Sequence, residues 1–394
     1  MPKILCLTSH DLDGPDYGAA LRCRQLFRLL EKFGEVSVVL TGQKIFWREP
    51  LPPLCGGFKL AGAVPFLPTP RRTPVEHLRA EMDPRFLNSH QCQASVGDGA
   101  WLKAMMAQHD LVWLHGLPNA NGCGLWHWPR TVLDIDDIPS AYYASLLAQA
   151  GGVGEKLRWR RQIWLWRRRE KKLAERFAAI CVCSEPDRRW LGGAENIFTV
   201  PNGFTAPEQI PVRQPAIPPR LGFVGKYDYA PNREGVRWFV EKVWPLILQK
   251  MPATKLRLAG AGTETENWSA HRNVEALGWV ADGAAEMATW ALSIVPVLTG
   301  GGTRIKIAEA FSRQCPLVST SLGAHGYDVA DGCELLLADT PEMFAAKCLQ
   351  ILAQPETGQK LAEAGWRKFN EQWTWERQAD KIARVVETVL QKKP

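Results

Sequence analysis

Short apolar runs of strand length alternate with helix-like runs along almost the whole chain, and a proline-rich break divides this alternation into two series. A strand followed by a helix favours a parallel sheet that is covered by helices. The strand-like runs are residues 3–8, 36–40, 111–114, 131–135, 179–183 and 197–200 before the break, and 221–225, 255–260, 274–279, 292–297, 317–320 and 334–337 after it. A helix is predicted over 18–33, with Arg22, Arg24 and Arg28 off its apolar face. The pattern predicts two open α/β domains.

Breaks in the periodicity give the domain bounds. Residues 206–219 are rich in proline, so they are predicted to link an N-terminal domain over 1–205 to a C-terminal domain over 220–372. Residues 373–394 are predicted to form a helix that either ends the second domain or crosses back to the first. Residues 43–98 are also rich in proline and lack a lasting period, which predicts an insertion, either a lid or an irregular surface excursion.

Composition favours a globular protein without a membrane span. The residues are 46% hydrophobic and 23% charged, an ordinary balance for a globular protein. A length of 394 residues is sufficient for two hydrophobic cores. No apolar run reaches the roughly 18 residues that a spanning helix needs. The ten cysteines form no CxxC pair and the eight histidines do not fall at zinc-ligand spacings. The sequence therefore predicts a reduced, cytoplasmic compartment and no metal site.

Positive charge is concentrated in one segment. The formal net charge is +7, and residues 155–176 alone carry 10 Lys or Arg against 3 Asp or Glu. Because the rest of the chain is close to neutral, no nucleic-acid partner is predicted. The segment 155–177, EKLRWRRQIWLWRRREKKLAERF, is predicted to be a helix. Its tryptophans and arginines suit either an anionic membrane surface or packing against its own domain.

The stretch 292–310, LSIVPVLTGGGTRIKIAEA, has the clearest binding pattern. A short strand runs through a glycine turn into a helix, so backbone amides at the helix start can approach an anion without a Cβ in the way. The turn consists of Gly300, Gly301 and Gly302. Lys306 and Glu309 share one helix face. This set predicts a nucleoside-diphosphate site, with phosphates at the turn and Lys306 and ribose hydroxyls at Glu309.

Glycine turns follow other strands of the second series, at residues 225, 260–262 and 323. The carboxyl ends of parallel strands meet at one edge of a sheet, where open α/β domains bind their ligands. Four glycine turns on one edge favour ligand binding over the alternative, an ordinary strand–turn–helix with solvated charges.

Six short motifs lie in order over residues 200–326. They are VPNG at 200–203, LGFVGKYDYAPN at 221–232, LRLAGAG at 256–262, PVLTGGGTRIKIAEA at 296–310, CPLVST at 315–320 and GAHG at 323–326. In order and spacing they resemble the family 4 retaining glycosyltransferases (glycosyltransferase group 1), and the resemblance extends over essentially the whole chain. It implies an α/β chain of the GT-B fold, with two Rossmann-like parallel-sheet domains that face each other across a cleft.

The resemblance implies a donor-binding role for matched positions of the second domain. The family pattern has two glutamates separated by seven residues; the second matches Glu309 at the ribose, whereas the first position holds Gly301. This departure implies that backbone groups of the glycine turn hold the sugar hydroxyls. Lys226 matches the basic residue that meets the diphosphate, and Asn232 stands near the place of a second family lysine.

The departing nucleoside diphosphate gains negative charge, which fixed cations and amides stabilise without reorganising. The candidates for this role are Lys226, Arg304, Lys306 and the amides of Gly302 and Thr303. If these groups suffice, no metal is needed.

In the first domain the resemblance matches Gly18 to a glycine loop beside the donor phosphates and His115 to a histidine near the reacting sugar. His115 is therefore predicted to orient or polarise the donor sugar or the acceptor hydroxyl, with a histidine satisfied in the core as the alternative. His10 and Asp137 are predicted on the acceptor side. Residues 134–137, DIDD, resemble a metal-binding DxD, but their place at the end of a strand favours an acceptor-side or capping role.

The implied activity is that of a retaining glycosyltransferase of the hexosyltransferase type, without metal or cofactor. It moves a sugar from a nucleotide-diphosphate sugar to a saccharide or lipid-linked acceptor in bacterial cell-surface polysaccharide or glycolipid assembly. The expected location is the cytoplasm or, peripherally, the inner face of the membrane. Two alternatives stay open: a non-hydrolysing sugar-nucleotide epimerase or a phosphorylase of this fold, and a non-catalytic nucleotide-sugar-binding member, which Gly301 favours.

Overall fold

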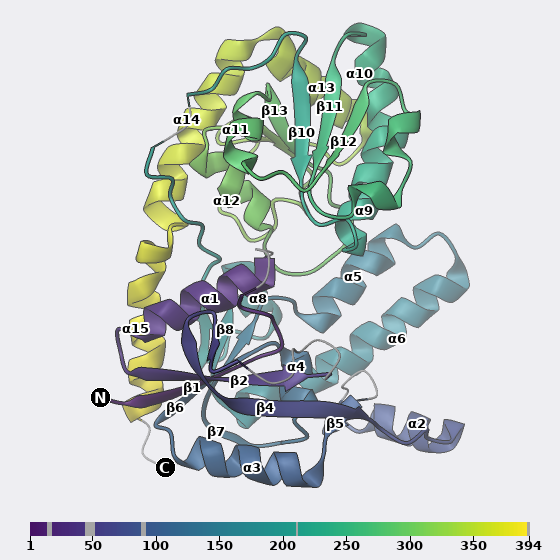
Figure 1. Ribbon diagram of the computed structural model, residues 1–394. Helices are drawn as coiled ribbons and strands as arrows, with labels where there is room; N and C mark the ends of the chain where they lie inside the picture. Colours follow the sequence, from purple (N-terminus) through teal and green to yellow (C-terminus); the bar gives the residue numbers. More distant parts are fainter. Residues whose placement is uncertain (14–17, 44–51, 88–91, 210–211, 392–394) are drawn as a thin grey trace. The chain divides into compact units, whose positions relative to one another are not determined.

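The computed structural model describes residues 1–13, 18–43, 52–87, 92–209 and 212–391 (Figure 1). The chain divides into two compact units: unit 1 holds Met1–Pro201 and Gln378–Pro394, and unit 2 holds Asn202–Arg377. Each unit has a largely parallel sheet connected by helices, which confirms the predicted fold class. None of the helices in the described ranges is long and apolar enough to cross a membrane.

The parallel strands of unit 1 run in the order β4-β2-β1-β6-β7-β8-β9. Their bounds are β1 Lys3–Thr8, β2 Glu35–Gly42, β4 Phe58–Pro68, β6 Leu111–His115, β7 Trp128–Ile135, β8 Phe177–Val182 and β9 Ile197–Thr199. Two short strands, β3 (Leu54–Cys55) and β5 (Cys92–Ala94), pair antiparallel with β4. The sheet grows in one direction from β1 and then in the other from β6, so the switch point lies between β1 and β6.

Helices connect the strands of this sheet. They are α1 Gly18–Leu30, α2 Pro74–Met82, α3 Val96–Ala107, α4 Leu117–Gly122, α5 Pro139–Gln149, α6 Val153–Glu170, α7 Leu173–Arg176, α8 Glu185–Trp190 and α15 Trp375–Gln391. Strand β6 reads LVWLH and each of its residues is buried, which places its final histidine inside the unit rather than on its surface.

Unit 2 has a fully parallel sheet in the order β12-β11-β10-β13-β14-β15. The strands are β10 Arg220–Val224, β11 Lys255–Ala259, β12 Val274–Gly278, β13 Leu292–Val295, β14 Leu317–Ser319 and β15 Leu336–Leu337. The helices are α9 Ala230–Trp238, α10 Trp244–Lys250, α11 Gly283–Ala288, α12 Ile305–Ser312, α13 Pro341–Ala353 and α14 Pro355–Gln372. The switch point of this sheet lies between β10 and β13, next to the loops that precede α9 and α12.

The predicted insertion at 43–98 contains β4, a strand of the sheet. β4 pairs in parallel with β2, and Val64 at its centre is fully buried. Gly62 and Pro65 hid this strand from the sequence pattern, since both residue types are uncommon within strands. A Cβ at Gly62 would lie 2.8 Å from the ring of Trp101, so the close packing of α3 on β4 needs glycine there. Residues 44–51 and 88–91 lie outside the described residues.

The predicted linker 206–219 has neither helix nor strand at 206–209 and 212–219, and residues 210–211 lie outside the described residues. The backbone amides of Gln214 and Ala216 donate hydrogen bonds to the carbonyls of Ala288 and Thr289, so this segment runs along unit 2. In the segment 373–394 the chain forms α15, whose residues from Gln378 onward group with unit 1. Residues 392–394 are not described.

The basic segment 155–177 is not one helix. α6 ends at Glu170, the short α7 ends at Arg176, and Phe177 opens strand β8. Phe177 is buried in the core of unit 1 because it begins the apolar run FAAICV. A period of 3.6 residues can accommodate this phenylalanine by chance, which is why the sequence pattern extended the helix too far.

Candidate active site

The glycine turn of unit 2 joins β13 to α12 beside the switch point of the sheet. Gly300 has φ +126° and Gly302 has φ +62°, conformations that side chains with a Cβ rarely adopt. No side chain caps the start of α12. Because the first amides of a helix have no partner within the helix, those of α12 are available to an anion.

Arg304 lies under this turn. Its Nη1 donates a hydrogen bond to the carbonyl oxygen of Gly302 at 2.6 Å and another to that of Gly301, and the side chain is buried. Tyr327 Oη donates to the Arg304 carbonyl at 3.0 Å, and Asn202 Nδ2 donates to Thr303 Oγ1 at 2.7 Å. Arg304 therefore fixes the shape of the turn, and its contact with a diphosphate stays a prediction.

Lys306, the second residue of α12, is held by neutral partners. Its Nζ donates to Asn232 Oδ1 at 3.0 Å and lies 5.2 Å from the ring centroid of Phe223. Among the described residues it forms no ion pair with a carboxylate. Burial, followed by the charge of Arg304, lowers the pKa of Lys306 to about 8, although Glu309 acts in the opposite direction. A desolvated cation without a counter-ion is suited to receive an anionic ligand.

Asn232 connects Lys306 to the loop after β10. Its Nδ2 donates to the Lys226 carbonyl at 2.8 Å while its Oδ1 accepts from Lys306. A Cβ at Gly225 would lie 2.9 Å from Asn232 Nδ2, so glycine allows this approach. The Lys226 side chain is half exposed and pairs with Asp228 at 3.0 Å. The structure thus brings together the backbone of Lys226, Asn232 in the first turn of α9 and Lys306 in the first turn of α12.

Glu309 lies one turn after Lys306 on α12. Its carboxylate pairs with Arg313 at 2.9 Å, and each of these two side chains is 16% exposed. The predicted ribose contact stays a prediction, since this carboxylate already has a partner that would have to share it.

Two other glycine turns lie on the same edge of the sheet. A Cβ at Gly260 would collide with the carbonyl oxygen of Gly225, and one at Gly323 would lie 2.7 Å from the carbonyl oxygen of Val295. The loops after β10 and β11 are therefore in direct contact, and the loop after β14 reaches β13. This packing gives a physical reason for the glycines besides ligand binding.

His115 of unit 1 belongs to a buried ionic network at the ends of β6 and β7. Its Nδ1 lies 2.9 Å from Asp134 Oδ2 and its Nε2 lies 3.5 Å from Asp136 Oδ2. Arg22 donates to the same Asp134 carboxylate from Nη2 at 2.6 Å and from Nε at 3.0 Å. Its Nη1 donates to the Val200 carbonyl at 3.0 Å. Asp134 thus fixes the orientation of His115 and neutralises Arg22.

The surroundings shift the pKa values of His115 and His10 in opposite directions. Burial alone lowers the pKa of His115, but Cys23, Asp136 and Asp134 together raise it well above its usual range. Burial and the neighbouring His115 lower the pKa of His10 to about 4. Burial raises the pKa of Asp134, but Arg22 and His115 reverse this and hold it below its usual range. The surroundings therefore favour the charged form of His115 and the neutral form of His10.

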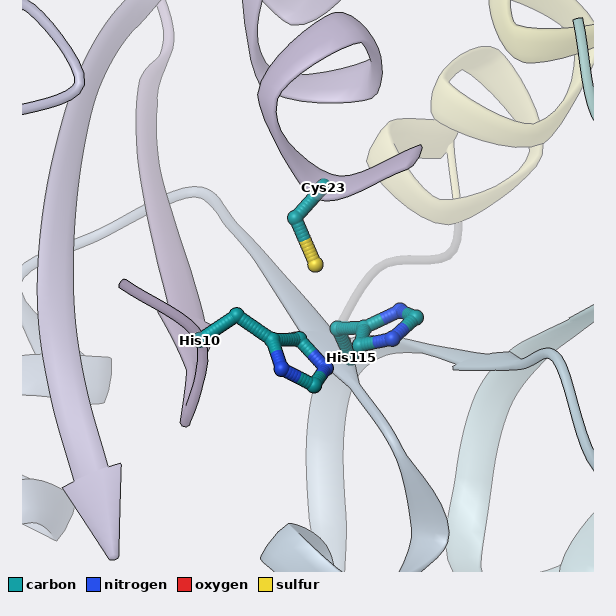
Figure 2. Close-up of side chains that lie close together, drawn as sticks. All are labelled: His10, Cys23 and His115. Atoms are coloured by element: carbon teal, nitrogen blue, oxygen red, sulfur yellow. The ribbon is translucent and has the colours of Figure 1, made fainter. Parts of the chain in front are cut away.

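Figure 2 shows His10 and Cys23 next to His115, with ring centroids of the two histidines 5.1 Å apart. Of the other predicted residues, Gly18 begins α1 and is exposed, and Asp137 is an exposed residue after β7. The sequence analysis missed Arg22, which was predicted off the apolar face but is 1% exposed, and Cys23. A long cationic side chain among apolar helix positions was the one signal that Arg22 offered.

Parts of the chain are similar in sequence to known proteins. Residues 218–354, within unit 2, match the family model described as "Glycosyl transferases group 1". A protein of Klebsiella pneumoniae, described as "Uncharacterized 44.6 kDa protein in cps region", is 26% identical over 163 residues. The match spans 36% of this chain and 41% of that relative, so the chain aligns with less than half of the relative's length.

Solved glycosyltransferases resemble the entire chain in fold. Sucrose-phosphate synthase from Thermosynechococcus elongatus has a TM-score of 0.67 at 17% identity, covering 98% of both chains. WaaG, a glycosyltransferase involved in lipopolysaccharide biosynthesis, has a TM-score of 0.65 at 16% identity, over 97% of this chain and 99% of WaaG. Anabaena HepE, solved in complex with UDP and glucose, has a TM-score of 0.63 at 14% identity, over 98% of this chain and 100% of HepE.

These similarities confirm the resemblance seen in the motifs and the two Rossmann-like units. Residues 218–354 match the group 1 glycosyltransferase family, and the chain as a whole has the fold of the GT-B glycosyltransferases.

Proposed function

We propose that this protein is a retaining glycosyltransferase that moves a sugar from a nucleotide-diphosphate sugar to a hydroxyl acceptor. The observation that carries the proposal is the position of Lys306, a desolvated ammonium held by Asn232 beside the uncapped start of α12 and the glycine turn. This position is the switch point of a parallel sheet, where such domains bind nucleotides. The UDP in the HepE structure is a precedent from a protein of the same fold.

In this proposal unit 2 binds the donor. Lys306, with Lys226, faces the diphosphate, the amides of Gly302 and Thr303 donate to its oxygens, and Glu309 accepts from the ribose hydroxyls. The bond between the anomeric carbon and the phosphate oxygen breaks, and these fixed donors stabilise the charge that develops on the phosphate. Cations of the protein perform the task that Mg²⁺ has in other transferases, so we expect transfer without a metal cofactor.

Unit 1 contributes His115 to the proposed reaction. Asp134 fixes the ring and raises the proton affinity of His115, which suits a donor of hydrogen bonds to a sugar hydroxyl. His10 and Asp137 are proposed on the acceptor side. The acceptor hydroxyl attacks the face from which the phosphate leaves, and its proton passes to the leaving phosphate oxygen, so the anomeric configuration is retained.

The proposed pathway is the assembly of a bacterial cell-surface polysaccharide or glycolipid, with a saccharide or lipid-linked acceptor. Support comes from the Klebsiella relative in a "cps region" and from WaaG in lipopolysaccharide biosynthesis. The proposed site of action is the cytoplasm or the inner face of the membrane.

A thermal-shift screen with nucleoside diphosphates tests the proposal. One of UDP, GDP or ADP is expected to raise Tm, and the corresponding sugar nucleotide is expected to release that diphosphate in the presence of acceptor and EDTA. Absence of both effects would overturn the proposal. An epimerised sugar nucleotide formed without acceptor would identify an epimerase, and binding without turnover would identify a non-catalytic member.

Glu309→Ala is expected to weaken nucleotide binding about 10- to 100-fold, because a hydrogen bond to a charged group contributes roughly 1.5–3 kcal/mol. The measurement is the Kd of the nucleotide by calorimetry. Arg313→Ala is the matched control, since it breaks the same ion pair but leaves the carboxylate in place. Equal losses in the two variants, or unchanged affinity of Glu309→Ala, would refute the ribose contact.

Helix α6 is the proposed membrane contact. Trp166 is buried and Trp159 stacks on Tyr143, so these two tryptophans pack within unit 1. Trp164 is 48% exposed and Leu157 is 60% exposed, among exposed arginines. Neighbouring α2 adds the exposed Val75, Leu78 and Met82, and Arg161 of α6 pairs with Glu81 of α2. Exposed apolar side chains within a basic surface suit an anionic bilayer.

The double variant Arg158→Gln/Arg160→Gln is expected to lower partitioning onto vesicles with anionic phosphatidylglycerol about 30-fold, since each basic residue contributes roughly 1 kcal/mol near such a surface. Vesicle sedimentation measures the fraction of protein that is bound. Lys360→Gln/Arg367→Gln removes two exposed charges from α14 and is the control. Unchanged partitioning of the α6 variant would exclude α6 as the contact.

A further inference from the structure

Two imidazoles and a thiol meet in unit 1. His10 follows β1, Cys23 lies in α1 and His115 ends β6, and these segments bring one potential ligand atom of each residue within 4.8 Å of the others (Figure 2). Cys23 and His115 are buried and His10 is partly exposed. The sequence spacing showed nothing of this cluster, because the three residues come from separate elements of the sheet edge.

The nitrogen and sulfur atoms of this cluster determine which metal ions it can bind. Imidazole and thiolate together suit Zn²⁺ and its analogue Co²⁺, whereas Mg²⁺ and Ca²⁺ take oxygen ligands. Three protein ligands with one further position are typical of an open zinc site. A bond of about 2.0–2.3 Å to each ligand requires the three atoms to move closer than their present limit, and the partly exposed His10 ring is the one that can turn.

The surroundings of His115 have the form of a metal site. Its Nδ1 bonds to Asp134 at 2.9 Å, which leaves Nε2 as the nitrogen for a metal. A carboxylate behind a ligating imidazole is the usual support for such a ligand. Asp136 Oδ2 lies 3.5 Å from Nε2, and this carboxylate is 32% exposed. It is not one of the three residues whose ligand atoms converge. The Sγ of Cys23 lies 3.5 Å from the hydroxyl oxygen of Thr8.

We propose that His10, Cys23 and His115 bind a zinc ion, with water in the fourth position. Binding releases the thiol proton of Cys23, and any proton on Nε2 of His115, to solvent. The ion then occupies the nitrogen of His115 that the transfer reaction uses. The effect of the ion on activity rests on the proposed function: Zn²⁺ is expected to inhibit sugar transfer, and a chelator is expected to restore it.

Titration of the full chain with Co²⁺, in the absence of nucleotide, tests the site. We expect one equivalent of Co²⁺ to give the visible absorption of a tetrahedral ion and a near-ultraviolet thiolate charge-transfer band, and Zn²⁺ to remove both. Cys23→Ser is expected to lose the charge-transfer band and at least about tenfold in affinity, and Asp134→Asn to lose about 10- to 100-fold. His10→Gln, at a less buried position, is expected to lower affinity without loss of the thiolate band.

Cys333→Ser, at an exposed cysteine of unit 2, is the matched control and should retain both bands. Absence of tetrahedral absorption in the parent protein, or a charge-transfer band that persists in Cys23→Ser, would overturn the site. Because the titration needs neither donor nor acceptor, its failure leaves the transferase proposal intact, and a protein without transferase activity still reports metal binding.

Discussion

Lys306→Ala is expected to lower kcat about 10²- to 10³-fold, because the variant loses a fixed cation that acts on the charge of the leaving diphosphate. Loss of one preorganised donor of this kind costs roughly 2.7–4 kcal/mol in the transition state. No carboxylate of the described chain pairs with Lys306, and its partners are the amide of Asn232 and the ring of Phe223. Release of the nucleoside diphosphate measures the rate.

Two further variants separate charge from packing. Lys306→Met retains an unbranched stem on Phe223 and should be as inactive as the alanine variant, since only the ammonium is missing. Lys347→Ala removes a lysine of the same unit that pairs with Asp331, and it should keep full activity. If either Lys306 variant has a kcat within a few-fold of that of the parent, the proposed contact of Lys306 with the phosphates is wrong.

The pH dependence follows from the lowered pKa of Lys306. In the free enzyme its ammonium loses a proton as the pH rises through about 8, so kcat/KM is expected to fall above that pH. The Met variant should lack this limb. The effect on folding has the opposite sign: the unfolded lysine, with a pKa of about 10.4, binds more protons than the folded one. The free energy of unfolding should therefore rise between about pH 8 and 10.4, and the Met variant should not show this rise.

Local sequence was sufficient to predict the glycine turn and the helix of the proposed donor site. The buried run of β13, the glycines that adopt positive φ and the start of α12 are contiguous, so their pattern predicted the turn and the face of Lys306. The contact between Lys306 and Asn232 joins residues 74 positions apart. Which polar groups meet across such a distance depends on how the starts of α9 and α12 lie relative to each other, and no periodicity specifies that.

Unit 1 shows the same limit more clearly. The end of β6 was visible in the sequence, and so was His115, but the partners of His115 were not. Arg22 and Asp134 are 112 positions apart and both buried. A rule that places arginine on the surface assigns Arg22 to the wrong side of α1, because the rule omits the carboxylate that makes its burial possible. β4 was missed for a related reason: its glycine and prolines are uncommon in strands unless neighbours such as Trp101 fill the space.

Asp134→Asn is expected to destabilise unit 1 by about 3–5 kcal/mol, because it leaves the guanidinium of Arg22 buried without a counter-ion. Asp134 is 0% exposed and binds both Arg22 and His115. Urea unfolding of the full chain, followed by a probe in unit 1, measures the loss. Asp137→Asn changes an exposed carboxylate three residues later and should stay within about 0.5 kcal/mol of the parent.

The double variant Arg22→Met/Asp134→Asn decides whether the cost is that of an unpaired charge. Removal of both charges should be less damaging than the sum of the single changes, because neither variant group then lies buried without its partner. Additive losses would mean that the pair has no coupling and that Asp134 acts through packing alone.

The pH dependence of the free energy of unfolding adds a second criterion. Since burial raises the pKa of Asp134 but Arg22 and His115 hold it below its usual range, its contribution is present at neutral pH and is lost as the pH falls through about 4 and below. His115 has the opposite sign: because its pKa is raised in the folded protein, its contribution is complete below about pH 6.5 and is lost as the pH rises through the folded value. In Asp134→Asn the first dependence should disappear and the second should become weaker, since Asp134, after Cys23 and Asp136, is one of the groups that raise the pKa of His115.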